Sequence, residues 1–73
     1  MDIDRLTRLI EANPQDEQLL LERGKQYWQQ RDIPHCFADY DAAIRLNPKS
    51  PARQLKEMAL QILAFYNRDM YNP

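Results

Sequence analysis

A chain of 73 residues supports one small domain, and below about 80 residues a core rarely supplies more than a few kcal/mol of stability. Hydrophobic residues make up 44% and charged residues 29%, a balance typical of a soluble globular chain and unlike that of a disordered one. The ten basic and eleven acidic residues leave a net charge of -1, which gives no overall attraction to nucleic acid or to an anionic membrane.

The single cysteine, Cys36, has no partner for a disulfide within the chain, which favours a reducing compartment. The first residues, from Met1 to Asn13, begin with acids and lack a long apolar run, unlike a signal peptide. No apolar stretch approaches the length that crosses a membrane. We therefore expect a cytoplasmic protein.

The first predicted helix covers residues 3–12. Its apolar residues recur at helical spacing, with Asp2 or Asp4 placed to cap its N-terminus: Ile3, Leu6, Leu9 and Ile10. Asn13-Pro14 ends it, because proline disfavours helical geometry in the residue before it.

The second predicted helix covers residues 16–30, with Asp16 as its N-cap. Its large apolar residues are Leu19, Leu20, Tyr27 and Trp28. Gly24, the only glycine, lies in its interior, where glycine costs up to about 1 kcal/mol relative to alanine. We therefore expect another helix to approach the backbone closely at Gly24.

The third predicted helix covers residues 34–46, follows a turn at 31–33 and has Pro34 at its first position. Its expected inward face consists of Phe37, Tyr40, Ala43 and Ile44, and its expected outer face includes Asp39, Asp41 and Arg45.

The fourth predicted helix covers residues 51–69, with Ser50 as N-cap and Pro51 in the first turn. Its apolar stripe is wider than one packing partner requires, and comprises Leu55, Met58, Ala59, Ile62, Leu63, Phe65 and Tyr66. The tail from Met70 to Pro73 is expected to fray.

Residues 17–50 carry a repeat pattern of large, glycine, aromatic, small and proline positions. The positions are Leu20, Gly24, Tyr27, Cys36, Tyr40, Ala43 and Pro48. Asn13-Pro14 and Asn47-Pro48 also stand 34 positions apart. The chain therefore resembles the tetratricopeptide-repeat family. The resemblance implies one all-α domain over residues 1–73, a right-handed helix-turn-helix solenoid of about four helices: a half repeat, one full repeat and a terminal capping helix.

The chain departs from the family pattern at several positions. Arg23 stands where leucine usually precedes Gly24, Cys36 replaces alanine, and Arg31 stands where the turn often has glycine. A left-handed backbone at Arg31 would cost about 1–2 kcal/mol. In the fourth helix Gln54, Met58 and Gln61 replace the family's large residue, glycine and tyrosine, as in a capping helix.

No constellation of catalytic, cofactor-binding or metal-binding residues is visible. His35 and Cys36 are adjacent, so their side chains point about 100° apart on a helix, and no second histidine or cysteine completes a metal site. We expect His35 to be exposed near Asp39 and Cys36 to be a packing residue. Ser50 and Thr7, the only hydroxyl residues of their kinds, have no neighbouring base.

The first helix of each repeat lines a concave groove in the tetratricopeptide-repeat family. The resemblance therefore implies a partner-binding face made of Gln18, Leu21, Glu22, Lys25, Trp28 and Gln29, with Lys56 on the fourth helix. Trp28 has two interpretations, an exposed groove residue or a residue buried against the last helix. The family's clamp for a C-terminal carboxylate is not expected, because Leu21 and Ala59 replace its polar residues.

We therefore expect a non-enzymatic protein-binding or peptide-binding module with no cofactor. The alternative is a module that forms homodimers through apolar residues of its outer helices, with Ile3, Leu63, Phe65 and Tyr66 as candidates. A nucleic-acid interface at Arg45, Lys49, Arg53 and Lys56 is disfavoured, because no exposed aromatics are interleaved with these basic residues.

Overall fold

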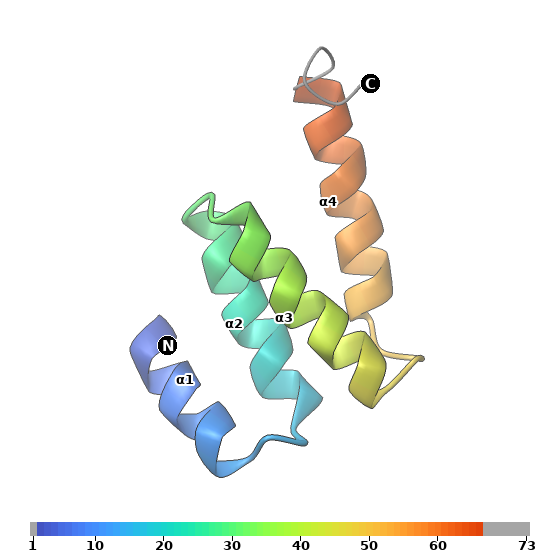
Figure 1. Ribbon diagram of the computed structural model, residues 1–73. Helices are drawn as coiled ribbons and strands as arrows, with labels where there is room; N and C mark the ends of the chain where they lie inside the picture. Colours follow the sequence, from blue (N-terminus) through green and yellow to red (C-terminus); the bar gives the residue numbers. More distant parts are fainter. Residues whose placement is uncertain (1, 67–73) are drawn as a thin grey trace.

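The structure, a computed structural model, describes residues 2–66, which form four helices in the order of the chain and no strand (Figure 1). The helices are α1 (Ile3–Ala12), α2 (Glu17–Gln29), α3 (Ile33–Leu46) and α4 (Ala52–Tyr66). The extensive contacts join helices that follow one another in sequence, and the pair α2 and α3 shares the largest contact. The all-helical fold class is thus confirmed over the described residues.

Side-chain caps explain where the helices begin. Asp2 accepts a hydrogen bond from the backbone N–H of Arg5, so Asp2 and not Asp4 caps α1. Asp16 caps α2 through the N–H of Gln18, and Asp32 caps α3 in the same way. Because the cap is Asp32, α3 begins at Ile33, one residue before the predicted start, and Pro34 lies in the second position of the helix.

The ends of the helices also lie close to the predicted positions. Helix α1 has the predicted bounds, and the backbone N–H of Asn13 donates to the carbonyl oxygens of Leu9 and Ile10. Helix α4 begins after Ser50, whose hydroxyl oxygen accepts from the N–H of Ala52 at 3.1 Å. The described part of α4 ends at Tyr66, so the prediction for its last turn and for the tail concerns residues 67–73, outside the described range.

The turn between α2 and α3 has a left-handed residue at Arg31, with φ of 64°. The N–H of Asp32 donates to the carbonyl of Tyr27 at 2.9 Å, and the N–H of Arg31 donates to that of Trp28 at 3.0 Å. These two bonds form the Schellman motif that usually has glycine at its left-handed position. An arginine therefore occupies this position at a cost of about 1–2 kcal/mol.

Helices α2 and α3 approach each other closely at Gly24. A β-carbon at this position would lie 2.6 and 2.8 Å from two ring atoms of Tyr40, closer than van der Waals contact permits. Tyr40 is itself buried, so its ring has little room to move. The expectation of a close helix approach at the only glycine is confirmed.

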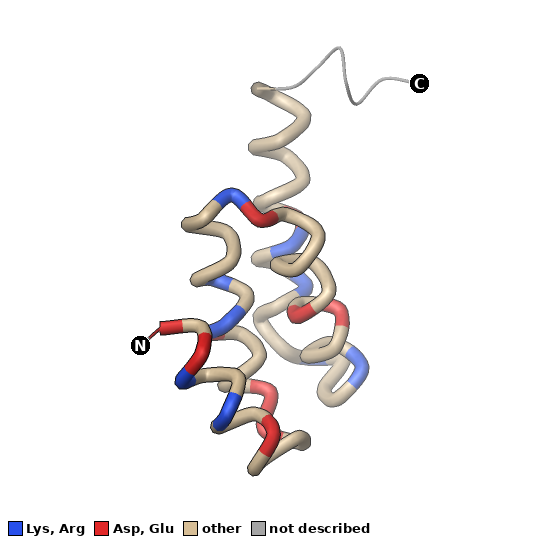
Figure 2. The backbone as a smooth tube through the Cα atoms, turned by 60° about the vertical axis from the view of Figure 1, so that its left-hand side comes forward, with Lys and Arg blue, Asp and Glu red and all other residues tan. Residues whose placement is uncertain are grey.

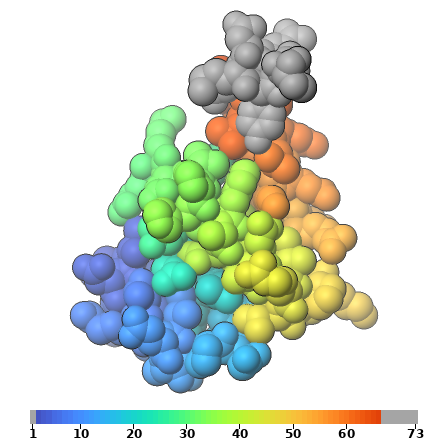
Figure 3. Space-filling model, in the orientation of Figure 1, coloured from blue at the N-terminus to red at the C-terminus, as the bar shows by residue number. Residues whose placement is uncertain are grey.

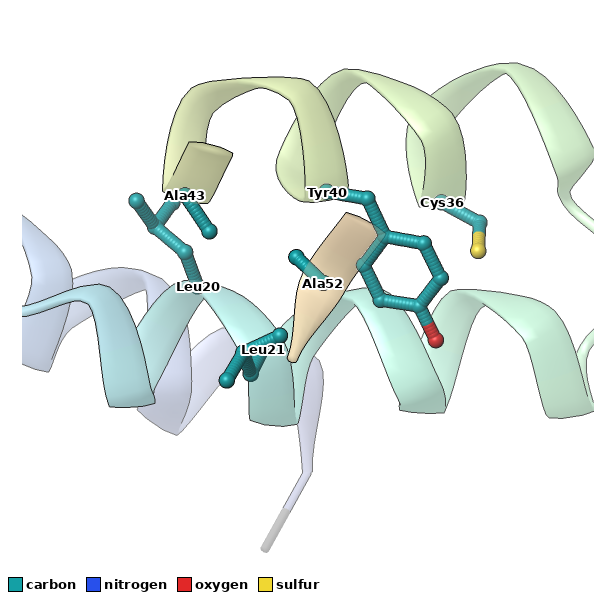
Figure 4. Packing of buried hydrophobic residues seen from close by; sticks show 6 residues of the cluster. All are labelled: Leu20, Leu21, Cys36, Tyr40, Ala43 and Ala52. Carbon is teal, nitrogen blue, oxygen red and sulfur yellow. The ribbon is translucent and has the colours of Figure 1, made fainter. Parts of the chain in front are cut away.

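The core lies between α2 and α3 and is extended by the first residue of α4 (Figure 4). Its buried members are Leu20, Leu21, Cys36, Tyr40, Ala43 and Ala52. Phe37 and Ile44 are half-buried against this cluster, as their predicted inward positions require, and Tyr27 is half-buried against it as well. Leu6, on α1, is also fully buried.

Helix α4 shares only part of its length with the other helices. Ala52 and Ala59 are buried, and Lys56 donates to a carboxylate oxygen of Asp41 on α3 at 2.7 Å. Beyond this contact, the C-terminal half of α4 extends past the turn between α2 and α3, as two views of the backbone agree (Figures 1 and 2). Several apolar residues of this half are therefore exposed.

Candidate partner-binding surface

A cleft of about 740 Å³ lies between the C-terminal half of α4 and the turn that joins α2 to α3. One wall consists of Ile62, Leu63 and Tyr66 on α4. The opposite wall consists of Trp28, Gln29, Arg31 and Ile33, from the end of α2 to the start of α3. The cleft exists because α4 diverges from α3 after its first turns, so that side chains of both walls line an open space.

The cleft walls are mostly apolar and carry a single charge, the guanidinium of Arg31. Gln29 and Tyr66 in the lining supply hydrogen-bonding groups. Apolar walls with a few polar groups at defined positions are typical of surfaces that bind another molecule. The single cation favours a partner with an acidic group at that end of the cleft.

Trp28 is intermediate between the two interpretations that the sequence left open. It is half-buried, it packs against the α2–α3 core cluster, and it also lines the cleft. Its indole therefore fixes one wall of the cleft while leaving part of its surface accessible. Gln29, the neighbouring residue of the predicted set, is exposed at the same wall.

The other predicted partner-binding residues are not part of this cleft. Leu21 is buried in the core, so the expectation that it shares an exposed face with Lys25 and Trp28 is wrong. Leu21 belongs to the same core cluster as Ala52, the first residue of α4. Lys56 is directed toward α3 by its bond to Asp41, away from the cleft lining.

Gln18, Glu22 and Lys25 remain exposed along α2. Lys25 and Glu22 lie 3.8 Å apart and are each about half exposed, an arrangement that contributes little to stability. Their availability to a partner agrees with the prediction, and a role in binding stays a prediction.

The sequence prediction missed a buried ion pair between α2 and α3. The guanidinium of Arg23 donates to both carboxylate oxygens of Asp39, at 2.8 and 2.7 Å, and to the hydroxyl of Thr7 on α1 at 3.1 Å. Asp39 is only 4% exposed, so its predicted place on the outer face is wrong. The hydrogen bond to Asp39 raises the pKa of Arg23 above its usual value, so the guanidinium stays charged.

One feature of the sequence could have revealed this pair. Arg23 occupies a position where the repeat pattern has leucine, and a guanidinium there is costly to bury without an acidic partner. Asp39 lies on the next helix beside the buried Tyr40 and is the carboxylate within reach. The network ties three helices together, so we assign it a structural role.

The residues that invite a catalytic interpretation lie apart from the cleft. His35 is exposed, and its Nδ1 atom lies 2.8 and 2.9 Å from the carboxylate oxygens of Asp32, not near Asp39 as predicted. The hydrogen bond from His35 lowers the pKa of Asp32. The ring of His35 also stacks on Tyr27, with 5.0 Å between centroids. These contacts give His35 a structural role at the N-terminus of α3.

Cys36 is a packing residue, as predicted, with 0% of its surface exposed. Burial raises the pKa of its thiol, which disfavours the reactive thiolate. Among residues 2–66, no group of three or more histidine, cysteine or acidic side chains is arranged to hold a metal ion. Within the same range, no helix is both long and apolar enough to cross a membrane.

Comparison with known proteins does not place the chain in a family. No protein-family model matches it, and neither the curated proteins nor the solved structures contain a match.

Proposed function

We propose that this chain is a non-enzymatic binding scaffold built like a tetratricopeptide repeat, in which α2 and α3 form one full repeat. Helix α1 then corresponds to the second helix of a preceding repeat and α4 to the first helix of a following one, in a right-handed solenoid. The 34-residue spacing of the two Asn-Pro pairs and the close approach at Gly24 support this proposal. The lone, buried Cys36 is consistent with a reducing, cytoplasmic setting.

The observation that carries the function is the apolar cleft beside Trp28. Its walls come from two helical segments, so an elongated amphipathic partner fits it better than a small polar substrate. We infer that the occupant is an amphipathic helix of another protein, with apolar residues at i, i+3 or i+4, and i+7. An acidic residue at one end of that helix would pair with Arg31.

Selection from a displayed library of helical peptides against the intact chain tests this proposal. We expect enrichment of peptides with the apolar spacing above and an acidic residue at one end. Trp28 is the only tryptophan, so its fluorescence reports on occupancy of the cleft directly. An emission shift on titration of a selected peptide places the peptide beside Trp28.

Two charge-reversal variants distinguish peptide binding in the cleft from binding elsewhere on the surface. Arg31→Glu should weaken binding of the selected acidic peptides by about three- to tenfold, with the largest difference at low salt. Arg45→Glu is the matched control, because Arg45 is exposed on α3 outside the cleft lining. Peptides that bind both variants equally and leave Trp28 emission unchanged would place the binding site elsewhere.

The non-enzymatic part of the proposal has a separate test. A hydrolase or transferase activity that is lost in His35→Ala would overturn it, since His35 is the only histidine in the chain.

A further inference from the structure

The far half of α4 carries a second apolar stripe beside the one that meets the core, which we call the outer stripe: Met58, Ile62, Phe65 and Tyr66. These side chains are 58%, 42%, 77% and 76% exposed, respectively. With Gln61 they line a shallow hollow of about 350 Å³. The first three recur at i, i+4 and i+7, the spacing of a seam between two paired helices. Ile62 and Tyr66 also line the cleft beside Trp28.

The outer stripe is distinct from the stripe that α4 uses within the chain. The inner stripe contains the buried Ala52 and Ala59 and the half-buried Leu55 and Leu63. One apolar stripe is sufficient to dock a helix onto a small core, and charged residues usually occupy the remaining face. Among residues 2–66, Met58 and Phe65 therefore belong to neither the core cluster nor the cleft lining, and they leave an apolar face of helix α4 exposed.

Charge distinguishes this face from the other outer surfaces of the molecule. Residues 58–66 contain no acidic or basic residue, and the backbone coloured by charge shows this stretch without red or blue (Figure 2). A two-fold interface brings the same patch of both copies together, so any net charge in it would repel itself. The outer stripe meets this condition, and the charged exterior of α1 does not.

The exposed area is enough for a weak dimer. A buried aromatic side chain contributes about 150–250 Å², so Phe65 and Tyr66 at about three-quarters exposure offer about 230–380 Å² per copy. Met58 and Ile62 bring the total for two copies close to about 1,000 Å², the lower limit for specific interfaces. Such an interface supports association only at high concentration.

We propose that the outer stripe is a self-association surface, on which α4 pairs with α4 of a second copy around a two-fold axis near Ile62. The two helices run antiparallel, because this arrangement opposes their dipoles. Met58 of each copy then lies against the aromatic residues near the end of α4 in the other copy, a favourable sulfur–aromatic contact. This refines the predicted dimer surface, since Phe65 and Tyr66 belong to it whereas Leu63 faces inward and Ile3 is half-buried on α1.

Sedimentation equilibrium over about 10 µM to 1 mM tests the proposal, because mass action populates a weak dimer only toward the upper end of this range. The average mass of the wild-type chain should rise from 8.8 kDa toward twice this value. Phe65→Glu should weaken the association at least about tenfold, because each copy would bury an unpaired carboxylate against the apolar stripe of the other copy, near its Met58. Circular dichroism should show unchanged helix content, since Phe65 is largely exposed.

Ala64→Glu is the matched control for the added charge. Ala64 is exposed and lies about 100° around the helix from Phe65, on the side of Glu57. This variant should dimerise like the wild type. A wild-type chain that remains monomeric at about 1 mM, or equal effects of the two substitutions, would overturn the proposal.

A cross-linking experiment tests the orientation of the helices in a Cys36→Ala background. An equimolar mixture of Met58→Cys and Tyr66→Cys chains, oxidised by dissolved oxygen, should give the mixed disulfide in preference to either symmetric product. Predominantly symmetric products would contradict the antiparallel pairing.

The self-association surface is independent of the proposed peptide function at two positions. Met58 and Phe65 belong to the outer stripe and do not line the cleft beside Trp28. Phe65→Glu should therefore lose dimerisation and still bind the selected peptides. Failure of either proposal is then distinguishable from failure of the other.

Discussion

Helices α1 and α4 flank the same α2–α3 pair, and they differ in how much of their surface is apolar. Helix α1 has a single apolar face directed at α2, and its exposed positions include Asp4, Arg5, Arg8 and Glu11. Helix α4 has an inner stripe against the core and the exposed outer stripe. The space-filling view shows α1 in blue and the first turns of α4 in yellow and orange on opposite sides of the α2–α3 pair (Figure 3).

The two flanking helices therefore present different outer surfaces, a charged one on α1 and an exposed apolar one on α4. A terminal helix with a charged exterior closes an array of helices, because its outer face is stable in water. A terminal helix with a second apolar face leaves the array open to another helix. The following substitutions test this difference, beginning with the contact on which both ends depend.

Gly24→Leu should unfold the domain. Even a β-carbon at this position would lie 2.6 Å from the buried ring of Tyr40, and overpacking of this kind costs about 1–3 kcal/mol or more. Thermal unfolding followed by circular dichroism measures the effect. Gly24→Ala is the milder companion variant, and it should still destabilise the chain although alanine favours helix by about 1 kcal/mol. A wild-type melting temperature in both variants would contradict the close packing of α2 on α3.

Asp39→Ala should destabilise the α1 side of the molecule by about 2–4 kcal/mol. Removing one partner of a fully buried ion pair costs about 3–5 kcal/mol, and the 19% exposure of the Arg23 side chain reduces this penalty. The matched variant on the α4 side is Asp41→Ala, whose ion pair with Lys56 is 31–42% exposed and contributes about 0–1 kcal/mol. Urea unfolding should give a clearly larger loss of unfolding free energy for Asp39→Ala than for Asp41→Ala. Equal losses would contradict the proposed difference between the α1 and α4 sides.

Trp28→Ala should lower the free energy of unfolding by about 2 kcal/mol. Truncation of a fully buried tryptophan to alanine costs about 3–5 kcal/mol, and this indole is only half-buried. We expect a protein that is still helical at low temperature and has lost its affinity for cleft-binding peptides. Trp28→Phe should retain most of both properties, since it keeps an aromatic wall. Full peptide affinity in the alanine variant would show that the cleft wall is not the contact surface.

Arg31→Gly should stabilise the chain by up to about 1 kcal/mol, because glycine adopts the left-handed backbone at φ of 64° without steric cost. The gain is partly offset by the larger backbone entropy of glycine in the unfolded chain. Denaturant midpoints of this variant and of Arg31→Ala, which keeps the β-carbon and removes the charge, distinguish backbone relief from charge removal. No gain with glycine relative to alanine would contradict the left-handed turn.

The smallest expected effect concerns the N-terminus of α3. The hydrogen bond from His35 lowers the pKa of Asp32 below its usual 3.8, so His35→Ala should raise it toward that value. Since the folded-state pKa is the lower one, the contact stabilises the fold above the unfolded-state pKa. This stability is lost as the pH falls through the folded-state pKa. A carboxyl titration followed by NMR measures the change, and an unaltered Asp32 pKa would contradict the contact.

The helix boundaries were predictable because their causes are local. Asp16 and Ser50 cap the helices that follow them and Asn13-Pro14 ends α1, as predicted, whereas α3 begins one residue earlier than predicted because Asp32 is its cap. The close approach at Gly24 was predictable for a similar reason, since a lone glycine inside a helix needs a packing explanation. The structure agrees with the sequence wherever one short segment determines the outcome.

The candidate surface was less predictable because it depends on interactions between distant residues. Asp39 is buried only because Arg23, 16 positions earlier, meets it from the neighbouring helix. The cleft depends on the angle at which α4 leaves α3, and residue spacing does not determine an interhelical angle. Of the predicted partner-binding residues, Trp28 and Gln29 therefore lie in the cleft and Leu21 does not.

The order of the helices along the chain has a kinetic consequence. Each extensive contact joins neighbours in sequence, so little loop-closure entropy opposes the formation of any of them. Chains with such local contacts fold in about microseconds to milliseconds. The α2–α3 pair, which shares the largest contact, is the natural nucleus, and the far half of α4 can separate and return without opening it. Amide hydrogen exchange should therefore be fastest in that half of α4, so a partner helix would meet a segment that rearranges far more often than the domain unfolds.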